Sequence, residues 1–409
     1  MSEQAPANEP PIDRPPVVAD AVPPAADVAG AAQIRIGGLK IPTATLRAYT
    51  MVFALIVIWA VFHYTTNQTF LGPRNLSNLL KQSSVTGVLA VGMLMVIVAG
   101  QIDLSVGSVV GLAGGMAAMM QGKGVLVALG TAIVVGLVIG ALHGLLVAYV
   151  NIPAFIVTLG GMLAWAGVTL GLMKGETITL TLPQFRSIGE QFIAPQLGTA
   201  LAVLSIAAIA WFNWRRISAR RRHNLAASGP GVTIARIAVP SLVIALFVYL
   251  MNKQDGVPIS VLIMLVVAVA GAFVTQNTTF GRYLYAIGGN PDAARLSGIS
   301  LRRHILSAFC IMGALAGLAA LIHTARQGSA APEAGKLMEL DAIAACVIGG
   351  TSLMGGRGTV FGAILGALIM ASLDNGMSLL NFQSYVQPMV KGTVLVAAVG
   401  FDMLSRRQG

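Results

Sequence analysis

The sequence predicts an all-α polytopic membrane protein with about 10–12 transmembrane helices. Hydrophobic residues make up 56% of the 409 residues and charged residues only 10%, so a soluble fold would leave much apolar surface uncovered. The apolar residues gather in long runs such as residues 125–150, and about 20 apolar residues span the hydrocarbon core. The 47 glycines favour close packing of membrane helices, whereas a membrane barrel would need short alternating strands, which are not seen. This composition excludes a soluble enzyme.

The first 46 residues differ in composition from the rest of the chain. They hold 8 of the 18 prolines together with alanine and a few acids, and such a segment cannot bury enough apolar surface to fold. They also lack the basic start and immediate apolar stretch of a cleavable signal. We predict a disordered cytoplasmic tail at 1–46, a transmembrane domain at 47–404 and a short cytoplasmic tail at 405–409.

Twelve apolar segments follow along the chain, and each is a candidate span. Those at 83–99, 104–121 and 339–355 are short or rich in glycine, which indicates that some are broken helices or half-spans. In order, the segments are 47–66, 83–99, 104–121, 125–150, 153–173, 198–214, 236–251, 258–276, 304–325, 339–355, 358–380 and 386–404.

The basic residues predict the orientation of these spans. Of the 26 Lys and Arg residues, 17 fall on the side that holds both termini, 8 fall on the opposite side, and Lys391 lies inside a span. Cytoplasmic loops carry an excess of Lys and Arg, so we predict cytoplasmic N and C termini. The cluster at 215–222 is the clearest anchor, because it follows an apolar run ending in Trp211 and Trp214. The same rule explains the net charge of +11 without nucleic acid, since no aromatic stacking platform accompanies the basic residues.

One extracytoplasmic segment is long, at residues 174–197. It mixes polar residues with Phe185, Ile188, Phe192 and Ile193. Two interpretations are open: an amphipathic helix on the outer surface, where an extracytoplasmic partner would dock, or a plain loop.

The cytoplasmic loop at 277–303 has a pattern that is not typical of a simple linker. The run 288–291 (Gly-Gly-Asn-Pro) predicts a sharp turn, because glycine and asparagine tolerate positive φ. A short helix is expected from Asp292, ending near Gly298. A helix that exposes small apolar residues outside the membrane fits a groove on a cytoplasmic protein. The residues expected to form this contact are Gly281, Arg282, Ala286, Gly288, Gly289, Asn290, Ala293, Ala294 and Gly298.

Polar residues within the apolar part are candidates for lining a pathway. Asp103, Ser105 and Ser108 lie between two apolar runs, and an ionisable group at membrane depth is costly unless it faces protein or water. The alternative is that Asp103 and Ser105 cap a helix beginning at Leu104.

A second polar group lies deep in a later apolar segment. Asp374 and Asn375 either line a pathway or form a hydrogen bond between helices. Lys391 either pairs with one of the acids or faces the outer leaflet.

Several kinds of site are missing from the sequence. The two cysteines, Cys310 and Cys346, lie in apolar runs and form no CxxC spacing, so no disulfide framework or metal site is expected. The phosphate-loop pattern GxxxxGK[ST] is absent, so the chain does not bind ATP by that route.

Three motifs are specific when taken together: GRYLYAIGGNPDAARLSGI at 281–299, VAGQIDLSVGSVVGL at 98–112, and ELDAIAACVIGGTSLMGGRGTVFGAILGALI at 339–369. Together they resemble the permease subunits of ABC importers for monosaccharides, the ribose, galactose and xylose type. That family usually has glycine where this chain has Gln101.

This resemblance implies a type II-like ABC importer permease fold, in which the loop at 277–303 is the coupling helix that contacts the ATPase. It implies that the chain is not an enzyme and binds no cofactor directly, because the partner subunit uses the ATP. The implied partners are a cytoplasmic ABC ATPase, a periplasmic sugar-binding protein, a second permease copy as a homodimer, and the lipids of the bacterial inner membrane. The excess length at 198–257, expected to be an insertion with an extra helix pair, is similar to xylose-type members, so D-xylose or another pentose is the implied substrate.

Other function classes stay open at this point. A secondary transporter driven by an ion gradient would use Asp103, Asp374 and His143 as carriers. A channel or scaffold would explain the composition but not the exposed helix in 281–299. The same ABC machinery would also suit another sugar or a nucleoside.

Overall fold

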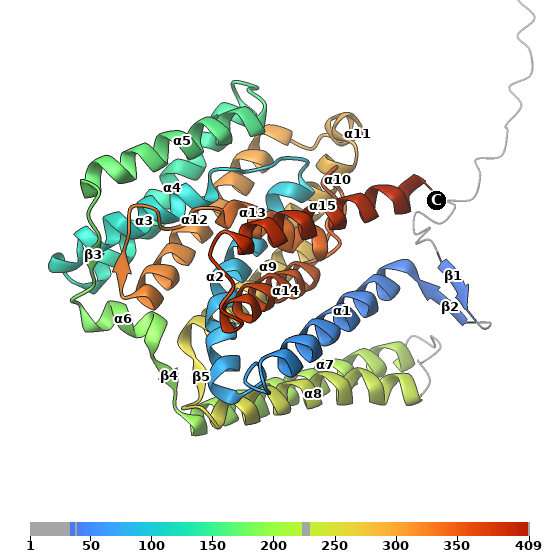
Figure 1. The fold of residues 1–409 in the computed structure, drawn as a ribbon. Coiled ribbons are helices and arrows are strands. Elements are labelled where there is room, and N and C mark those ends of the chain that lie inside the picture. Colours follow the sequence, from blue (N-terminus) through green and yellow to red (C-terminus); the bar gives the residue numbers. More distant parts are fainter. Residues whose placement is uncertain (1–32, 37–38, 223–229, 408–409) are drawn as a thin grey trace, which may run out of the picture. The chain divides into compact units, whose positions relative to one another are not determined.

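The fold is that of a computed structural model, which describes residues 33–36, 39–222 and 230–407 (Figure 1). The chain divides into two units, Met1–Arg47 and Ala48–Gly409, each described by itself. In the first unit β1 (Gln33–Ile36) and β2 (Leu39–Pro42) pair antiparallel, because isoleucine and leucine alternate with polar residues. Residues 1–32 and 37–38 of the predicted tail lie outside the described residues, as do 408–409 at the C-terminal end.

The second unit is built almost entirely from α-helices, and α1 begins in the first unit. The helices are α1 (Thr43–Thr65), α2 (Pro73–Val98), α3 (Val106–Met119), α4 (Val125–Ala148), α5 (Ala154–Met173), α6 (Pro183–Glu190), α7 (Pro195–Arg222), α8 (Pro230–Asn252), α9 (Ile259–Asn277), α10 (Thr279–Gly289), α11 (Pro291–Leu296), α12 (Leu301–Gln327), α13 (Met338–Ile348), α14 (Val360–Leu379) and α15 (Val386–Arg407), with a 3₁₀ turn at Gln121–Lys123. Two short antiparallel pairs join the connections: β3 (Ile178–Thr179) with β6 (Ser329–Ala330), and β4 (Phe192–Ile193) with β5 (Val257–Pro258).

The helices confirm the predicted all-α polytopic fold. In the part of the chain that the structure describes, eight helices are long and apolar enough to cross a membrane. Three shorter apolar helices accompany them, at Thr50–Thr65, Val106–Met119 and Val386–Gly400. The eight are α2, α4, α5, α7, α8, α9, α12 and α14.

Two of the predicted spans differ from the observed helices. The segment at 83–99 is the second part of a longer helix, α2, which begins at Pro73. The first turns of this helix are polar, and they lower the mean hydropathy of that part of the sequence. The segment at 339–355 is helical only as far as Ile348, because Gly349 and Gly350 end α13, and Gly350 has φ +83°. An 11-residue helix is too short to span a bilayer.

The long extracytoplasmic segment and the predicted insertion each contain ordered structure. Within 174–197, α6 packs against α12 and α9, and buries Phe185, so the helix rests on other helices of the chain. Within 198–257, α7 and α8 pack against each other (Figure 1). Only 11% of the most apolar stretch of each helix is buried.

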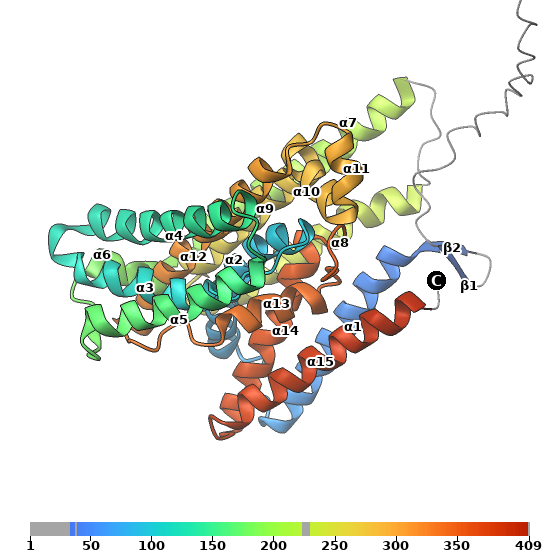
Figure 2. The ribbon, with the colours of Figure 1, turned by 90° about the horizontal axis from the view of Figure 1, so that it is seen from above.

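The centre of the second unit is formed by α2 and α12. The most apolar stretch of α2 is 83% buried, and α12 packs on α2, α3 and α4 (Figure 2). The crossing of α4 and α12 is unusually close because glycines face each other there. A Cβ atom at Gly136 would overlap the carbonyl oxygen of Gly313, and one at Gly140 would overlap that of Phe309. Small residues allow such backbone contact between membrane helices.

Replacing Gly136 with Val should separate α4 from α12. We expect a loss of about 1–3 kcal/mol in the free energy of unfolding, the usual cost of overpacking a filled interior. The matched control is Gly130→Val on the same helix, where a Cβ atom meets nothing within 4 Å. Thermal unfolding of both variants in detergent measures the effect, and equal melting temperatures would contradict the close crossing.

Candidate functional site

The segment between α9 and α12 consists of two short helices, α10 and α11. The Thr278 hydroxyl accepts a hydrogen bond from Gly281 N at 3.2 Å and so caps α10. The Asn290 side chain accepts one from Ala293 N at 3.0 Å, and Pro291 occupies the first turn of α11. Gly298, with φ +81°, follows the end of α11.

The predicted sharp turn at 288–291 is wrong in its backbone conformation. Neither Gly288 nor Gly289 has positive φ, since α10 continues through both. The chain turns at Asn290 in an extended conformation, with φ −156°. Positive φ at the turn is therefore not the reason for the two glycines.

The outer surface of this segment is exposed and partly apolar. Leu284 and Ile287 are buried against the helices below, whereas Tyr283 is 38% exposed and Leu296 is 87% exposed. Among the residues expected to make a contact, Gly281 and Ala294 are buried, Gly288 is half-buried, and the exposed ones are Arg282, Ala286, Gly289, Asn290, Ala293 and Gly298. We call this exposed surface of α10 and α11 the coupling surface.

Beneath the coupling surface, the three sequence motifs meet backbone to backbone. A Cβ atom at Gly288 would overlap the carbonyl oxygen of Val98 at the end of α2, and one at Gly355 would lie 3.1 Å from the Cα of Gly100. Gly356 N donates a hydrogen bond to Val98 O at 2.9 Å. We call these glycines and Val98 the glycine junction. Sequence reasoning did not predict it, since the contact joins three distant segments.

A second contact ties α10 to the loop before α14. The Tyr285 hydroxyl donates a hydrogen bond to the Gly358 carbonyl oxygen at 2.8 Å. A displacement of α10 would therefore act on both the end of α2 and the loop at 349–359.

Neighbouring glycines in α10 should respond differently to substitution. Gly288→Ala should cost about 1–3 kcal/mol of stability, because its methyl group overlaps the Val98 carbonyl. Gly289→Ala should stay within about 0.5 kcal/mol, because its Cβ meets nothing within 4 Å. Thermal unfolding in detergent separates the two, and a tolerated Gly288→Ala would contradict the junction.

Asp103, Ser105 and Ser108 lie in and just after the non-helical link between α2 and α3. Helix α3 begins at Val106, and the Ser105 side chain makes no capping hydrogen bond, so the predicted cap of a helix starting at Leu104 is wrong for Ser105. Asp103 Oδ1 instead accepts bonds from Ser105 N at 2.9 Å and from Ser105 Oγ at 2.6 Å. Ser108 Oγ donates to Ser105 O at 2.7 Å.

These residues extend into a buried hydrogen-bonded chain that the sequence did not reveal. Trp165 Nε1, which only donates, lies 3.1 Å from His143 Nε2. His143 therefore carries its proton on Nδ1, which lies 3.2 Å from Ser105 Oγ. The chain of donors runs in one direction, from Trp165 through His143 and Ser105 to the Asp103 carboxylate. This chain of hydrogen bonds joins α5 and α4 to the non-helical link between α2 and α3.

Asp374 and Asn375 have other partners and do not join this chain. Lys391 Nζ lies 2.9 Å from Asp341 Oδ1 and 3.3 Å from Asp374 Oδ2, which confirms the predicted pairing of Lys391 with an acid. Asn375 exchanges two hydrogen bonds with Asn75, at 2.8 and 3.1 Å, linking α14 to the start of α2. Both groups thus connect helices.

Removing Lys391 should be costly, because two largely buried carboxylates would lose their counter-ion. We expect Lys391→Met to lower the free energy of unfolding by about 3–5 kcal/mol. The control is Lys336→Met, which breaks an exposed 3.6 Å pair with Glu333 and should cost about 0–1 kcal/mol. If the two variants unfold at the same temperature, the cluster at Lys391 contributes no more than a surface pair.

Over most of its length the chain is similar to permease components of transport systems. Residues 75–399 match the family described as branched-chain amino acid transport system / permease component. The xylose transport system permease protein XylH of Escherichia coli K12 is 42% identical over 91% of this chain and 95% of its own length. XylH of Haemophilus influenzae is also 42% identical, over 90% of this chain and 99% of its own. The ribose import permease protein RbsC of Escherichia coli K12 is 36% identical over 85% of this chain and 91% of its own. No solved structure matches the chain.

Proposed function

The chain belongs to the permease family of ABC importers, and on that premise we propose that it is the membrane-spanning subunit of an importer for a monosaccharide, with D-xylose as the expected substrate. A separate ATPase subunit would bind the coupling surface and hydrolyse the ATP. A periplasmic sugar-binding protein would deliver the sugar, and a second copy of this chain would complete the pathway in the bacterial inner membrane.

The observation that carries this proposal concerns the segment between α9 and α12. This segment has an exposed apolar side chain on α11 and close backbone packing beneath α10. Leu296 is 87% exposed on a short helix outside the long apolar helices, where an unpartnered leucine suits a groove on another protein. The contacts of the glycine junction beneath α10 are made by backbone atoms, with no flexible side chain between them to absorb a displacement. Movement of a bound ATPase would therefore pass directly to α2 and to the loop before α14.

The orientation follows from the basic residues. Arg215, Arg216, Arg220 and Arg222 end α7, and the excess of basic residues on that side favours the cytoplasm. With the end of α7 in the cytoplasm, α8 runs outward and α9 inward, so α10 and α11 lie in the cytoplasm and α12 runs outward. The coupling surface would then be available to an ATPase.

The choice of substrate rests on the relatives and on the chemistry of the polar residues. Proteins named as xylose permeases match more of this chain's residues than the ribose permease does. A neutral sugar needs groups that bind hydroxyls without a strong net charge. We assign Asp103, Ser105 and Ser108 to the wall of the pathway, because they lie in or just after the non-helical link between α2 and α3, and irregular backbone at membrane depth is tolerated where it is buried in protein or lines a cavity. Asp374 and Asn375 are assigned to helix packing.

Bulk added to the coupling surface should uncouple ATP hydrolysis from transport. Gly289→Trp should leave the packing of this chain intact, because a Cβ atom at Gly289 meets nothing within 4 Å. The indole ring would, however, block the contact between the coupling surface and the groove of the ATPase. In proteoliposomes with the ATPase and the loaded binding protein, we expect uptake to fall about tenfold or more, as for a hot spot in an interface. Gly122→Trp, equally open but next to α4's start, should keep normal uptake.

The energy source and the sugar are tested in the same vesicles. Uptake should require ATP and should survive collapse of the ion gradients. Uptake driven by a gradient without ATP would contradict the proposal and support a secondary transporter. A panel of pentoses and hexoses, bound to the cognate binding protein, identifies the substrate.

A further inference from the structure

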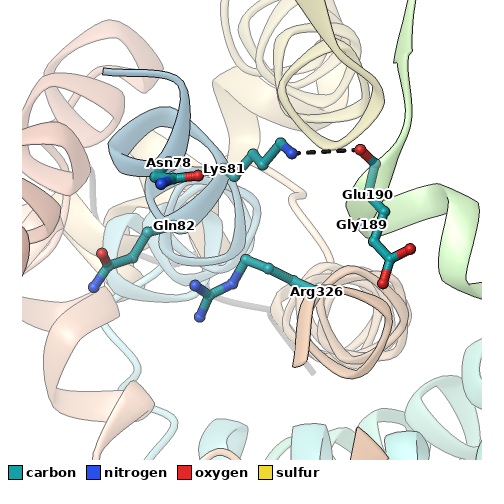
Figure 3. A pocket seen from close by; sticks show the side chains of 6 residues that line it. All are labelled: Asn78, Lys81, Gln82, Gly189, Glu190 and Arg326. Carbon is teal, nitrogen blue, oxygen red and sulfur yellow. Dashed lines mark hydrogen bonds between the residues drawn. The ribbon is translucent and has the colours of Figure 1, made fainter. Parts of the chain in front are cut away.

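A polar cavity lies at the end of the molecule away from the coupling surface. Its volume is about 460 Å³, which falls in the range of ligand pockets, roughly 300–1,000 Å³. It lies between α2, α6 and α12, and in Figure 3 the Arg326 side chain reaches across from α12 toward α2. The lining residues are Asn78, Lys81, Gln82, Gly189, Glu190 and Arg326.

The cavity and the coupling surface occupy opposite ends of the same two helices. Lys81 lies near the start of α2, whose last residue, Val98, belongs to the glycine junction. At a rise of about 1.5 Å per residue, the two positions are about 25 Å apart along the helix. Arg326 lies near the end of α12, and α12 begins directly after the coupling surface. With the coupling surface in the cytoplasm, the cavity is extracytoplasmic.

The hydrogen-bonding groups of the cavity are only partly used within the chain. Lys81 Nζ makes one long contact, 3.4 Å to the Glu190 carbonyl oxygen, and lies 4.0 Å above the Phe192 ring centroid. Arg326 Nε is buried and has no hydrogen-bond partner among the described residues. An unpaired buried donor costs about 1–3 kcal/mol, so a small movement of the Arg326 side chain that let a ligand accept this hydrogen bond would be favoured.

The lining suits a neutral ligand with several hydroxyl groups. Lys81 and Arg326 donate, and the Asn78 and Gln82 amides both donate and accept. The Glu190 carboxylate also accepts, although its Oε1 is already bonded to Arg186 Nε at 3.2 Å and Arg186 Nη2 at 2.8 Å. Hydroxyl groups also donate and accept, so a polyol satisfies both kinds of group. An oxyanion only accepts, so it could not donate to the amide oxygens of Asn78 and Gln82 or to the Glu190 carboxylate. No large apolar side chain lines the cavity to hold an apolar ligand.

The wall made by α6 is attached directly to α12. A Cβ atom at Gly189 would overlap the backbone of Ala325 and Arg326. A shift of α12 would therefore move Glu190 and Arg326 together and change the cavity. The coupling surface and the cavity are thus connected through one helix.

We propose that this cavity is an extracytoplasmic binding site for the monosaccharide, occupied after the sugar leaves its delivery protein. The inference rests on the proposed function for the identity of the ligand. The bound sugar would leave the cavity when the ATPase acts on the coupling surface and α12 moves.

Protection of a cysteine from labelling tests this site in the full importer. Asn78→Cys places a thiol on the cavity wall, and Gln184→Cys places one on the exposed part of α6 outside the cavity. With a membrane-impermeant maleimide, D-xylose should slow the labelling of Asn78→Cys severalfold and leave Gln184→Cys unchanged. The wild-type chain sets the background, since Cys346 is buried and Cys310 is half-buried in α12.

A second variant separates binding in the cavity from an indirect effect. Adding Arg326→Gln to Asn78→Cys should abolish the protection by D-xylose. Protection that persists in this double variant would overturn the inference, as would protection by inorganic phosphate in place of the sugar. ATP-driven uptake of D-xylose by the wild-type importer is measured separately. If the importer takes up D-xylose but the sugar gives no protection, the cavity is not a binding site for the sugar and the proposed function stands. If the importer takes up no sugar, the proposed function is wrong.

Discussion

Contact between backbones, made possible by glycine, is the constraint on which the rest of the structure depends. Between membrane helices the lipid supplies no hydrophobic driving force, so association relies on close packing and hydrogen bonds. Gly136 and Gly313 bring α4 against α12, and Gly288 brings α10 against the end of α2. Helix α12 connects the two regions, because it begins beside the coupling surface and continues through the crossing with α4. A single methyl group at either place would separate elements that must move as one.

Local signals in the sequence were sufficient for the fold class and for the short helix α11. Its cap, Asn290, its first residue, Pro291, and its end near Gly298 are all encoded within a few residues. The start of α2 was missed because its first turns are polar, and three of these residues, Asn78, Lys81 and Gln82, line a cavity that hydropathy does not detect. The turn at Gly288 was misinterpreted, because a glycine needed for close approach looks the same in sequence as one needed for positive φ. The glycine junction and the bond between His143 and Trp165 join distant segments, which no local pattern specifies.

The polar residues inside the apolar part divide into two kinds. Lys391 and Asn375 are bonded within the chain, and each fixes one element against another. Lys81 and Arg326 instead border an open cavity with hydrogen-bonding capacity left over. The first kind stabilises the helix arrangement through which movement is transmitted. The second kind is available to a ligand, and it lies where a delivered sugar would first meet the chain.

The most direct test of the central claim is the location of Leu296. A Leu296→Cys variant would be exposed to an impermeant thiol reagent in sealed membrane vesicles of both orientations, with and without the ATPase subunit. We expect labelling only in inside-out vesicles, and we expect the bound ATPase to suppress it. Labelling in right-side-out vesicles, or labelling that the ATPase leaves unchanged, would contradict a cytoplasmic surface through which ATP hydrolysis drives this chain.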